Sequence, residues 1–164
     1  MIKLMRIDER LIHGQVANEW SRKLAVNAIV VANDEAANND LIKMSLKMAA
    51  PQGMKVVIKT IDDAIKQLND PRAAHLEIFV VVNCPEDALK IIKNVAGVPL
   101  LNVGNFGRVN MEKMNRTHQL TPNLYVNDQE KDVFREIVAT GIECEFRTLI
   151  TDSPISIQSL IDKK

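Results

Sequence analysis

Several features that would place this chain in a specialised class of protein are missing. No apolar run approaches the ~20 residues that a membrane-spanning helix needs. The 21 lysine and arginine residues are balanced by 21 aspartate and glutamate residues, so no overall field attracts nucleic acid or an anionic membrane. We therefore expect no nucleic-acid partner and no membrane-spanning segment.

Cysteine is scarce, and a secretion signal is not evident. Cys84 and Cys144 are too few and too far apart to suggest a disulfide framework. Each lies in or beside an apolar segment, which is typical of a buried thiol. The chain begins directly on a strand-like segment carrying Lys3 and Arg6, so we expect no signal peptide and a cytoplasmic location.

Common catalytic motifs are missing too. No G-x-x-x-x-G-K-[ST] run occurs, so a nucleotide-binding P-loop is unsupported. No serine lies in a G-x-S-x-G motif, which argues against an α/β-hydrolase. His75 and His118 have no further ligands at metal-like spacing, so we interpret both as surface residues and expect no metal and no cofactor.

The chain does contain strand-like and helical segments in alternation, over a length that suits one domain spanning residues 1–164. Continuous apolar runs, typical of strands buried on both faces of a parallel sheet, occur at 28–32, 55–58 and 78–82. Further strands are expected at 2–7, 100–103, 124–126 and 144–150. The order predicts an α/β fold with a single open, mostly parallel twisted sheet and helices on both faces.

Two segments between the strands need an interpretation of their own. The helical stripe of Ala37, Leu41, Met44 and Met48 favours a place in the core over a binding groove. Residues 105–122 show little periodicity and are predicted to form a long surface connection. Such connections in compact domains are often functional.

The most informative segment is 6–16, which reads RIDERLIHGQV. It joins the first expected strand to a helix whose apolar face carries Val16, Trp20 and Leu24. His13 would lie just ahead of backbone N–H groups that have no intrahelical partner, where the helix dipole also attracts phosphate. A histidine in such an anion site is a candidate to carry a phosphoryl group.

This segment resembles the N-terminal motif of the mannose/fructose/sorbose family of IIB proteins, from the phosphoenolpyruvate-dependent sugar phosphotransferase system (PTS). The residues that match are Arg6, Asp8, Arg10, Leu11, His13, Gly14, Gln15 and Val16. Further similarity lies at 32–35, 49–53 with 55–56, 102–105 and 141–144. The chain departs from the family pattern after Gly104, where it has Asn105 and Phe106, and again at 149–151.

The resemblance implies a function as a phosphohistidine carrier. A PTS IIA protein would donate a phosphoryl group to His13, which would pass it to a sugar entering through the membrane subunits IIC and IID. The chain would then be a sugar phosphotransferase component, cytoplasmic and peripherally associated with the membrane transporter. Family members use the Nδ1 nitrogen, whereas the sequence alone selects neither the ring nitrogen nor the sugar.

Neighbours of His13 are candidates for binding the phosphoryl group or a partner protein. Arg10 and the backbone amides at Gly14 and Gln15 would supply donors to phosphoryl oxygens. The alternative interpretation of Arg10 is a solvated surface charge. The alternative interpretation of His13 is a capping or structural residue.

Arg6 and Asp8 each have more than one interpretation. Arg6 is expected either to contact the phosphoryl group or to form an ion pair with an acidic neighbour, Asp8 or Glu9. Asp8 orients an arginine or the His13 ring, or it caps a turn.

Ligands of open α/β sheets bind beyond the carboxyl ends of the strands, near a switch in strand order. Asp34, Gly104 and Asn105 follow or end such strands and are the possible rim of the site. The run 104–108 is equally consistent with a structural turn.

Two other classes of function remain open at this stage. A histidine phosphatase or mutase also places a phosphorylated His-Gly pair after an early strand, but Ile12 stands where such enzymes have arginine. A non-catalytic α/β ligand-binding or regulatory module would never acquire phosphate from a phosphocarrier system.

Overall fold

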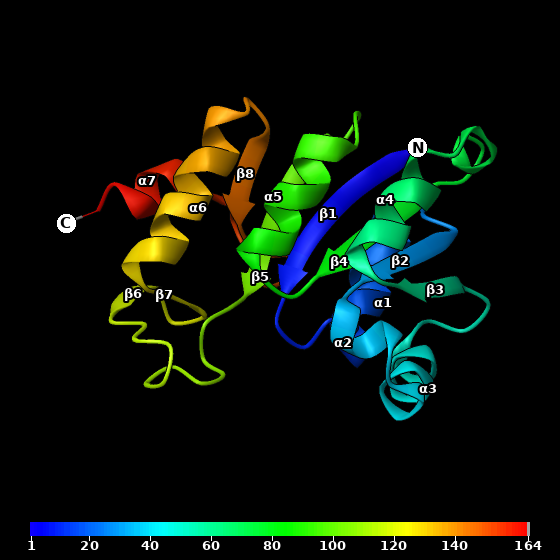
Figure 1. Cartoon of the computed structure of the whole chain (residues 1–164), viewed down its shortest axis with the longest axis horizontal. Coiled ribbons are helices and arrows are strands. Elements are labelled where there is room, and N and C mark those ends of the chain that lie inside the picture. Colours follow the sequence, from blue (N-terminus) through cyan, green and yellow to red (C-terminus); the bar gives the residue numbers. More distant parts are fainter. Residues whose placement is uncertain (164) are drawn as a thin grey trace.

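A twisted sheet of seven strands forms the centre of the molecule, in the order β3-β2-β4-β1-β5-β8-β9 (Figure 1). The structure is a computed structural model and describes residues 1–163. The strands are β1 (Ile2–Asp8), β2 (Ala28–Ala32), β3 (Lys55–Lys59), β4 (Ile78–Val82), β5 (Leu100–Asn105), β8 (Glu143–Phe146) and β9 (Ile155–Ser156). All neighbours pair in parallel except β9, which is antiparallel to β8. The predicted open, mostly parallel sheet is confirmed.

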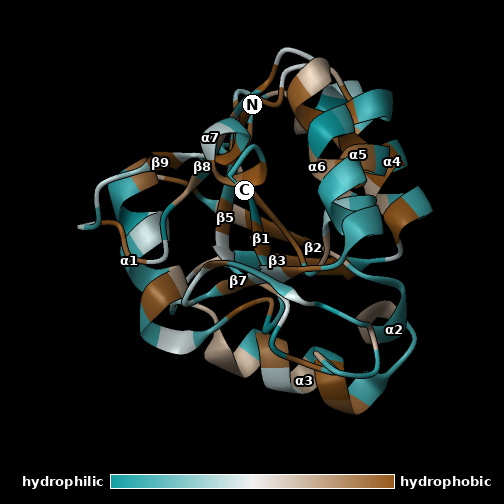
Figure 2. Cartoon of the chain, turned by 90° about the vertical axis from the view of Figure 1, so that its left-hand side faces the viewer, coloured by the Kyte–Doolittle hydropathy of each residue, from teal (hydrophilic) through white to brown (hydrophobic). Residues whose placement is uncertain are grey.

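Helices cover both faces of the sheet, as predicted. The helices are α1 (Gly14–Leu24), α2 (Asp34–Ala37), α3 (Asp40–Ala49), α4 (Ile61–Asn69), α5 (Pro85–Asn94), α6 (Asp128–Ala139) and α7 (Ile157–Ile161). Figure 2 shows α1 on one side of the sheet and α4, α5 and α6 on the other. Two apolar clusters fill the space, one around Trp20, Phe79 and Leu46, and one around Ile91 and Phe134. Within residues 1–163, none of the helices is both long and apolar enough to cross a membrane.

The order of the strands creates a divergence between β1 and β5. From β1 the chain crosses through α1 to β2, on one side, whereas from β5 it continues to β8, on the other. The two strands pair directly, with Asp8 opposite Asn105, and the Glu9 N–H donates to the Asn105 carbonyl at 2.9 Å. This is the kind of switch point at which open α/β sheets bind their ligands.

The methionine-bearing helix differs from the prediction. It divides into α2 and α3, because Asn39 interrupts the helix and accepts the N–H of Ile42 as the cap of α3. The new direction of α3 leaves Met44 and Met48 60% and 80% exposed, so the predicted place of this stripe in the core is wrong. In α3 only Leu46 is buried.

The remaining differences lie after β5. The last strand ends at Phe146 rather than residue 150, and the chain then returns as the short strand β9 and helix α7. The predicted connection 105–122 is irregular from 107 to 117 but includes β6 (His118–Thr121), which pairs with β7 (Leu124–Val126) in a hairpin. β6 and β9 are too short to show a periodicity, whereas the predicted strand at 124–126 is confirmed as β7.

Candidate functional site

His13 occupies the N-cap position of α1, in the loop that follows β1. Its backbone is extended, with φ −124° and ψ 94°, and its exposed side chain makes no capping hydrogen bond. The first turn of α1 carries no acidic residue, whereas the first turn of α4 carries Asp62 and Asp63. The amides and the positive dipole end of α1 therefore remain available to an anion beside the His13 ring.

Two buried residues hold the backbone that precedes His13. Leu11 has a left-handed conformation, with φ 61°, and its N–H donates to the Asp8 carbonyl at 2.8 Å. Leu11 and Ile12 are 9% and 5% exposed and pack into the cluster that contains Trp20. A non-glycine residue adopts this conformation only where its surroundings fix it. The imidazole thus reaches solvent from a backbone that is anchored on the core.

Asp8 lies between the two arginines and fixes the turn. Its Oδ1 accepts the Arg10 N–H at 3.0 Å and lies 3.5 Å from Arg10 Nε, while its Oδ2 lies 3.5 Å from Arg6 Nη2. Asp8 is 1% exposed, and no hydrogen bond between its carboxylate and the His13 ring is found among residues 1–163. Three roles were predicted for Asp8, and its contacts match two of them, the orientation of an arginine and the capping of a turn.

Arg10 extends from this turn toward solvent. Its side chain is 42% exposed, and Asp8 contacts only the Nε edge of its guanidinium. No hydrogen bond occupies the terminal nitrogens of Arg10 in the part of the chain that the structure describes. The two terminal nitrogens of Arg10 are therefore free to donate to an anion.

Arg6 lies inside the protein. It is 3% exposed, and its guanidinium donates to Asn102 Oδ1 at 2.6 Å and to the carbonyls of Arg147 and Thr148 at 3.2 and 3.0 Å, besides contacting Asp8. Burial lowers the pKa of this guanidinium, and the Asp8 carboxylate opposes that shift. Of the two interpretations of Arg6, the structure matches pairing with Asp8, because protein acceptors occupy its terminal nitrogens.

Gly104 and Asn105 belong to β5 itself and are buried. A Cβ on Gly104 would lie 2.0 Å from Nη2 of Arg6, so this glycine leaves room for the guanidinium of Arg6. Asn105 is 8% exposed, and its backbone carbonyl receives the N–H of Glu9. Both residues support the β1 loop from inside rather than lining an open rim.

The other predicted site residues lie at the surface. Gln15 is exposed in the first turn of α1 and donates to Glu19 at 3.3 Å. Gly14 has open space where a side chain would extend. Asp34, at the start of α2, accepts the N–H of Ile61 at 2.9 Å and so caps α4.

Two contributors to this site, Trp20 and Glu9, were not identified from the sequence. Trp20 lies between two guanidinium groups, 5.2 Å from Arg6 and 5.0 Å from Arg147, and donates to the Thr148 carbonyl at 3.4 Å. Glu9 contacts the loop after β5. A single tryptophan on a helix gives only a weak sequence signal, and Glu9 gives none, because its partners are backbone groups about one hundred residues away.

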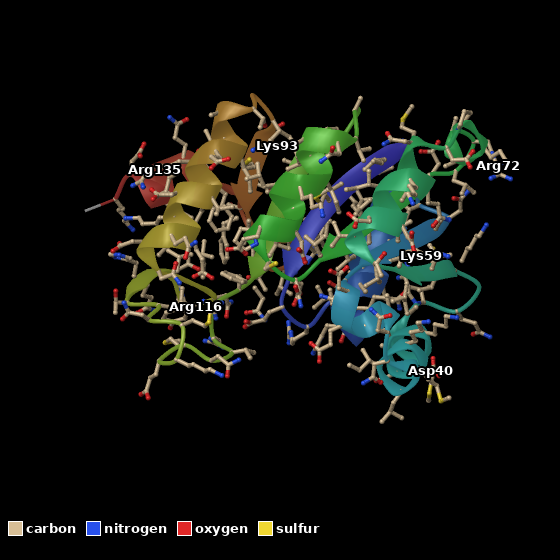
Figure 3. The ribbon with its side chains drawn as sticks, in the orientation of Figure 1. Asp40, Lys59, Arg72, Lys93, Arg116 and Arg135 are labelled. Atoms are coloured by element: carbon tan, nitrogen blue, oxygen red, sulfur yellow. The ribbon has the colours of Figure 1, made fainter. Side chains whose placement is uncertain are left out.

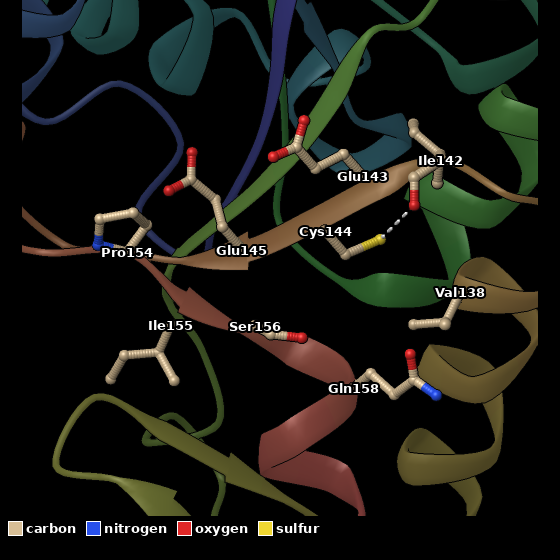
Figure 4. A pocket seen from close by; sticks show the side chains of 9 residues that line it. All are labelled: Val138, Ile142, Glu143, Cys144, Glu145, Pro154, Ile155, Ser156 and Gln158. Carbon is tan, nitrogen blue, oxygen red and sulfur yellow. Dashed lines mark hydrogen bonds between the residues drawn. The ribbon is translucent and has the colours of Figure 1, made fainter.

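A cavity of about 420 Å³ lies elsewhere, at the far edge of the sheet (Figure 4). It is lined by residues of α6, β8, β9 and α7, among them Val138, Cys144 and Gln158. No residue of the loop after β1 contributes to it, whereas a smaller cavity of about 210 Å³ is lined by Glu9 of that loop together with Phe106 and Arg116.

Comparison with known proteins agrees with this geometry. The family model described as PTS system sorbose subfamily IIB component matches residues 2–164. The chain is 45% identical over 139 residues to a probable phosphotransferase enzyme IIB component of Streptococcus pyogenes, covering 85% of each chain. It is 30% identical to the mannose-specific EIIAB component of Escherichia coli, covering 99% of this chain and 49% of that protein.

A solved structure extends the agreement to the fold. The crystal structure of the IIBSor domain of the sorbose permease from Klebsiella pneumoniae superposes with a TM-score of 0.90 at 29% identity, over 99% of this chain and 96% of that one. The chain belongs to the sorbose/mannose family of PTS IIB components, the phosphoryl-carrying components of a sugar phosphotransferase system.

Proposed function

We propose that His13 is the residue that carries the phosphoryl group in this IIB component. The observation that supports this most is the position of His13, exposed on an anchored loop at a helix start that has neither a side-chain cap nor an acidic first turn. Arg10 adds unoccupied guanidinium nitrogens to the same edge.

Phosphoryl transfer proceeds in two steps, first from the donor to His13 and then from His13 to the sugar. A ring nitrogen of neutral His13 attacks the phosphorus of the donor phosphohistidine, an N–P bond forms on His13, and the N–P bond on the donor breaks. A sugar hydroxyl then attacks the same phosphorus, the His13 N–P bond breaks, and the hydroxyl proton passes through water to the ring, which returns His13 to neutral imidazole. In each step the charge on the phosphoryl oxygens is met by Arg10 and by the amides of Gly14 and Gln15.

The partners follow from the two steps. We propose that a PTS IIA protein is the phosphoryl donor, because the relative from Escherichia coli is named an EIIAB component and has about twice the length that matches this chain. The acceptor is a sugar held by membrane subunits IIC and IID, so the protein works at the cytoplasmic surface of that transporter.

Labelling tests the assignment of His13. Incubation with phosphoenolpyruvate, the general phosphocarrier proteins and a cognate IIA protein should add one acid-labile, alkali-stable phosphoryl group, measured by intact mass. His13→Gln should abolish the label and leave the melting temperature almost unchanged, because an exposed loop side chain contributes little to the core.

The other two histidines provide matched controls. His75 is exposed, and His118 Nε2 lies 2.6 Å from Asp128 Oδ1, so neither has the surroundings of His13. His75→Gln and His118→Gln should accept the full label. A label that persists in His13→Gln, or hydrolysis of simple phosphomonoesters without a protein donor, would contradict the proposal.

A further inference from the structure

Glu9 joins the loop after β1 to the loop after β5. Its Oε1 accepts the N–H groups of Gly107 and Val109 at 3.1 and 3.3 Å, and its Oε2 accepts the N–H of Arg108 at 3.3 Å. Three consecutive backbone donors thus converge on one carboxylate, and such charge-assisted bonds are stronger than neutral ones. Figure 1 shows both loops at the carboxyl edge of the sheet.

We infer that Glu9 is a positioning residue for phosphoryl transfer, which holds the His13 loop against residues 107–109. The inference rests on the proposed function of His13. It assigns Glu9 no contact with the phosphoryl group, because its oxygens already accept backbone N–H groups and its negative charge would repel phosphate.

The His13 loop needs an anchor on this side. Asp8 holds the loop from within, through the Arg10 N–H, while Leu11 and Ile12 bury their side chains on the core. The strained conformation of Leu11 persists only if several contacts fix it together. Glu9 adds the contacts that face away from the core.

The loop 107–109 is itself a rigid support. Gly107 has φ +100°, and a Cβ there would lie 1.8 Å from the Tyr125 carbonyl oxygen, so this turn packs directly on β7. The Phe106 N–H donates to the Asn123 carbonyl, and the Tyr125 N–H donates back to the Phe106 carbonyl, each at 2.9 Å. The backbone that Glu9 binds is therefore fixed to the β6–β7 hairpin.

Arg116 extends this support to α6 (Figure 3). Its Nη1 donates to the Val109 carbonyl at 2.6 Å, and its other nitrogens bind Glu130 at 3.0–3.1 Å. Glu130 also completes the capping box of α6 by accepting the Asn127 N–H. A continuous set of contacts thus leads from the buried cap of α6 to Glu9, which lies four residues before His13 in the chain.

Three variants test this inference. Glu9→Ala removes all three bonds, whereas Glu9→Gln keeps an oxygen that can accept from Gly107 and Val109. Glu112→Ala is the matched control, because it removes one negative charge from an exposed side chain in the same loop region. Transfer from phosphorylated IIA should be measured at saturating donor, together with the melting temperature.

Glu9→Ala should lower the transfer rate at saturating donor by about 10- to 100-fold, as expected when a reacting group is misplaced by about 1 Å. Glu9→Gln should recover most of that rate, and Glu112→Ala should match the native protein. A native rate in Glu9→Ala, or a Glu9→Gln rate as low as that of Glu9→Ala, would overturn the inference while leaving His13 as the carrier.

Hydrogen exchange gives a readout that does not depend on phosphorylation. In Glu9→Ala the amides of residues 107–109 should exchange at least about tenfold faster, because their opening no longer breaks bonds to the carboxylate. The amides of Arg10 and Leu11, which donate to Asp8, should also exchange faster if Glu9 holds their loop in place. Unchanged protection at both loops would refute the positioning role. If these amides behave as expected but native His13 never accepts phosphate, it is the proposed function that fails.

Discussion

Gly104 and Arg6 are packed against each other on neighbouring strands: a Cβ on Gly104 would lie 2.0 Å from Nη2 and 2.1 Å from Cζ of Arg6. The absence of a side chain at residue 104 is what allows a guanidinium to lie inside the sheet layer. The sequence predicted that β5 ends at the rim of the site. Through this contact β5 instead supports Arg6, which contacts Asp8.

Gly104→Ala should therefore destabilise the protein. The added methyl group must displace a buried charged side chain, for which overpacking suggests a loss of about 2–3 kcal/mol, or ~5–10 °C in melting temperature. Thermal unfolding followed by circular dichroism measures this. If Gly104→Ala has normal stability but slow sugar transfer, Gly104 faces a partner protein and does not support Arg6.

Substitution of Arg6 should mainly lower stability, whereas substitution of Arg10 should mainly lower phosphoryl transfer. Arg6→Met leaves the Asp8 carboxylate buried without that partner and should cost about 3–5 kcal/mol in urea unfolding. Arg10→Met removes a side chain that is 42% exposed and should change stability by less than about 1 kcal/mol. Transfer per folded molecule should fall in Arg10→Met. The reverse pattern, with Arg10 essential for folding and Arg6 dispensable, would contradict both assignments.

The exposed face of α3 gives a prediction about stability. Met44→Gln and Met48→Gln should each change the free energy of unfolding by less than about 0.5 kcal/mol, because these side chains are 60% and 80% exposed. Leu46→Ala, on the buried face, should cost about 2–3 kcal/mol. Chemical unfolding of the three variants measures these free energies. A large loss of stability in Met44→Gln or Met48→Gln would mean that the methionine stripe lies in the core.

The two cysteines should be poorly reactive. Burial raises the pKa of the Cys144 thiol to about 12, and it also raises the pKa of Cys84. Both thiols, which are partly buried, stay protonated at pH 8, so alkylation should be at least about 100-fold slower than that of free cysteine and should accelerate as the pH rises. Mass spectrometry after iodoacetamide treatment measures the rates. Urea-unfolded protein should react at the ordinary rate, and fast alkylation of the folded protein would contradict the burial.

Local sequence signals were sufficient for the architecture. Runs such as 28–32 and 78–82 are apolar throughout because both faces of their strands are covered, so the sequence itself indicates a parallel sheet. Trp20 and its helical neighbours predicted α1, and the RIDERLIHGQV segment placed His13 at its start. Each of these features depends on residues close together in the chain.

Only the tertiary structure decided how residues far apart in the chain combine. Arg6 could face solvent or the interior, and its burial depends on acceptors at residues 102, 147 and 148. Gly104 reads as a loop glycine until Arg6 is seen beside it. Glu9 binds backbone N–H groups, which every sequence offers equally, so no pattern could reveal its partners. Periodicity reports which face of an element is apolar, but the long-range packing of the strands determines which polar groups meet at their ends.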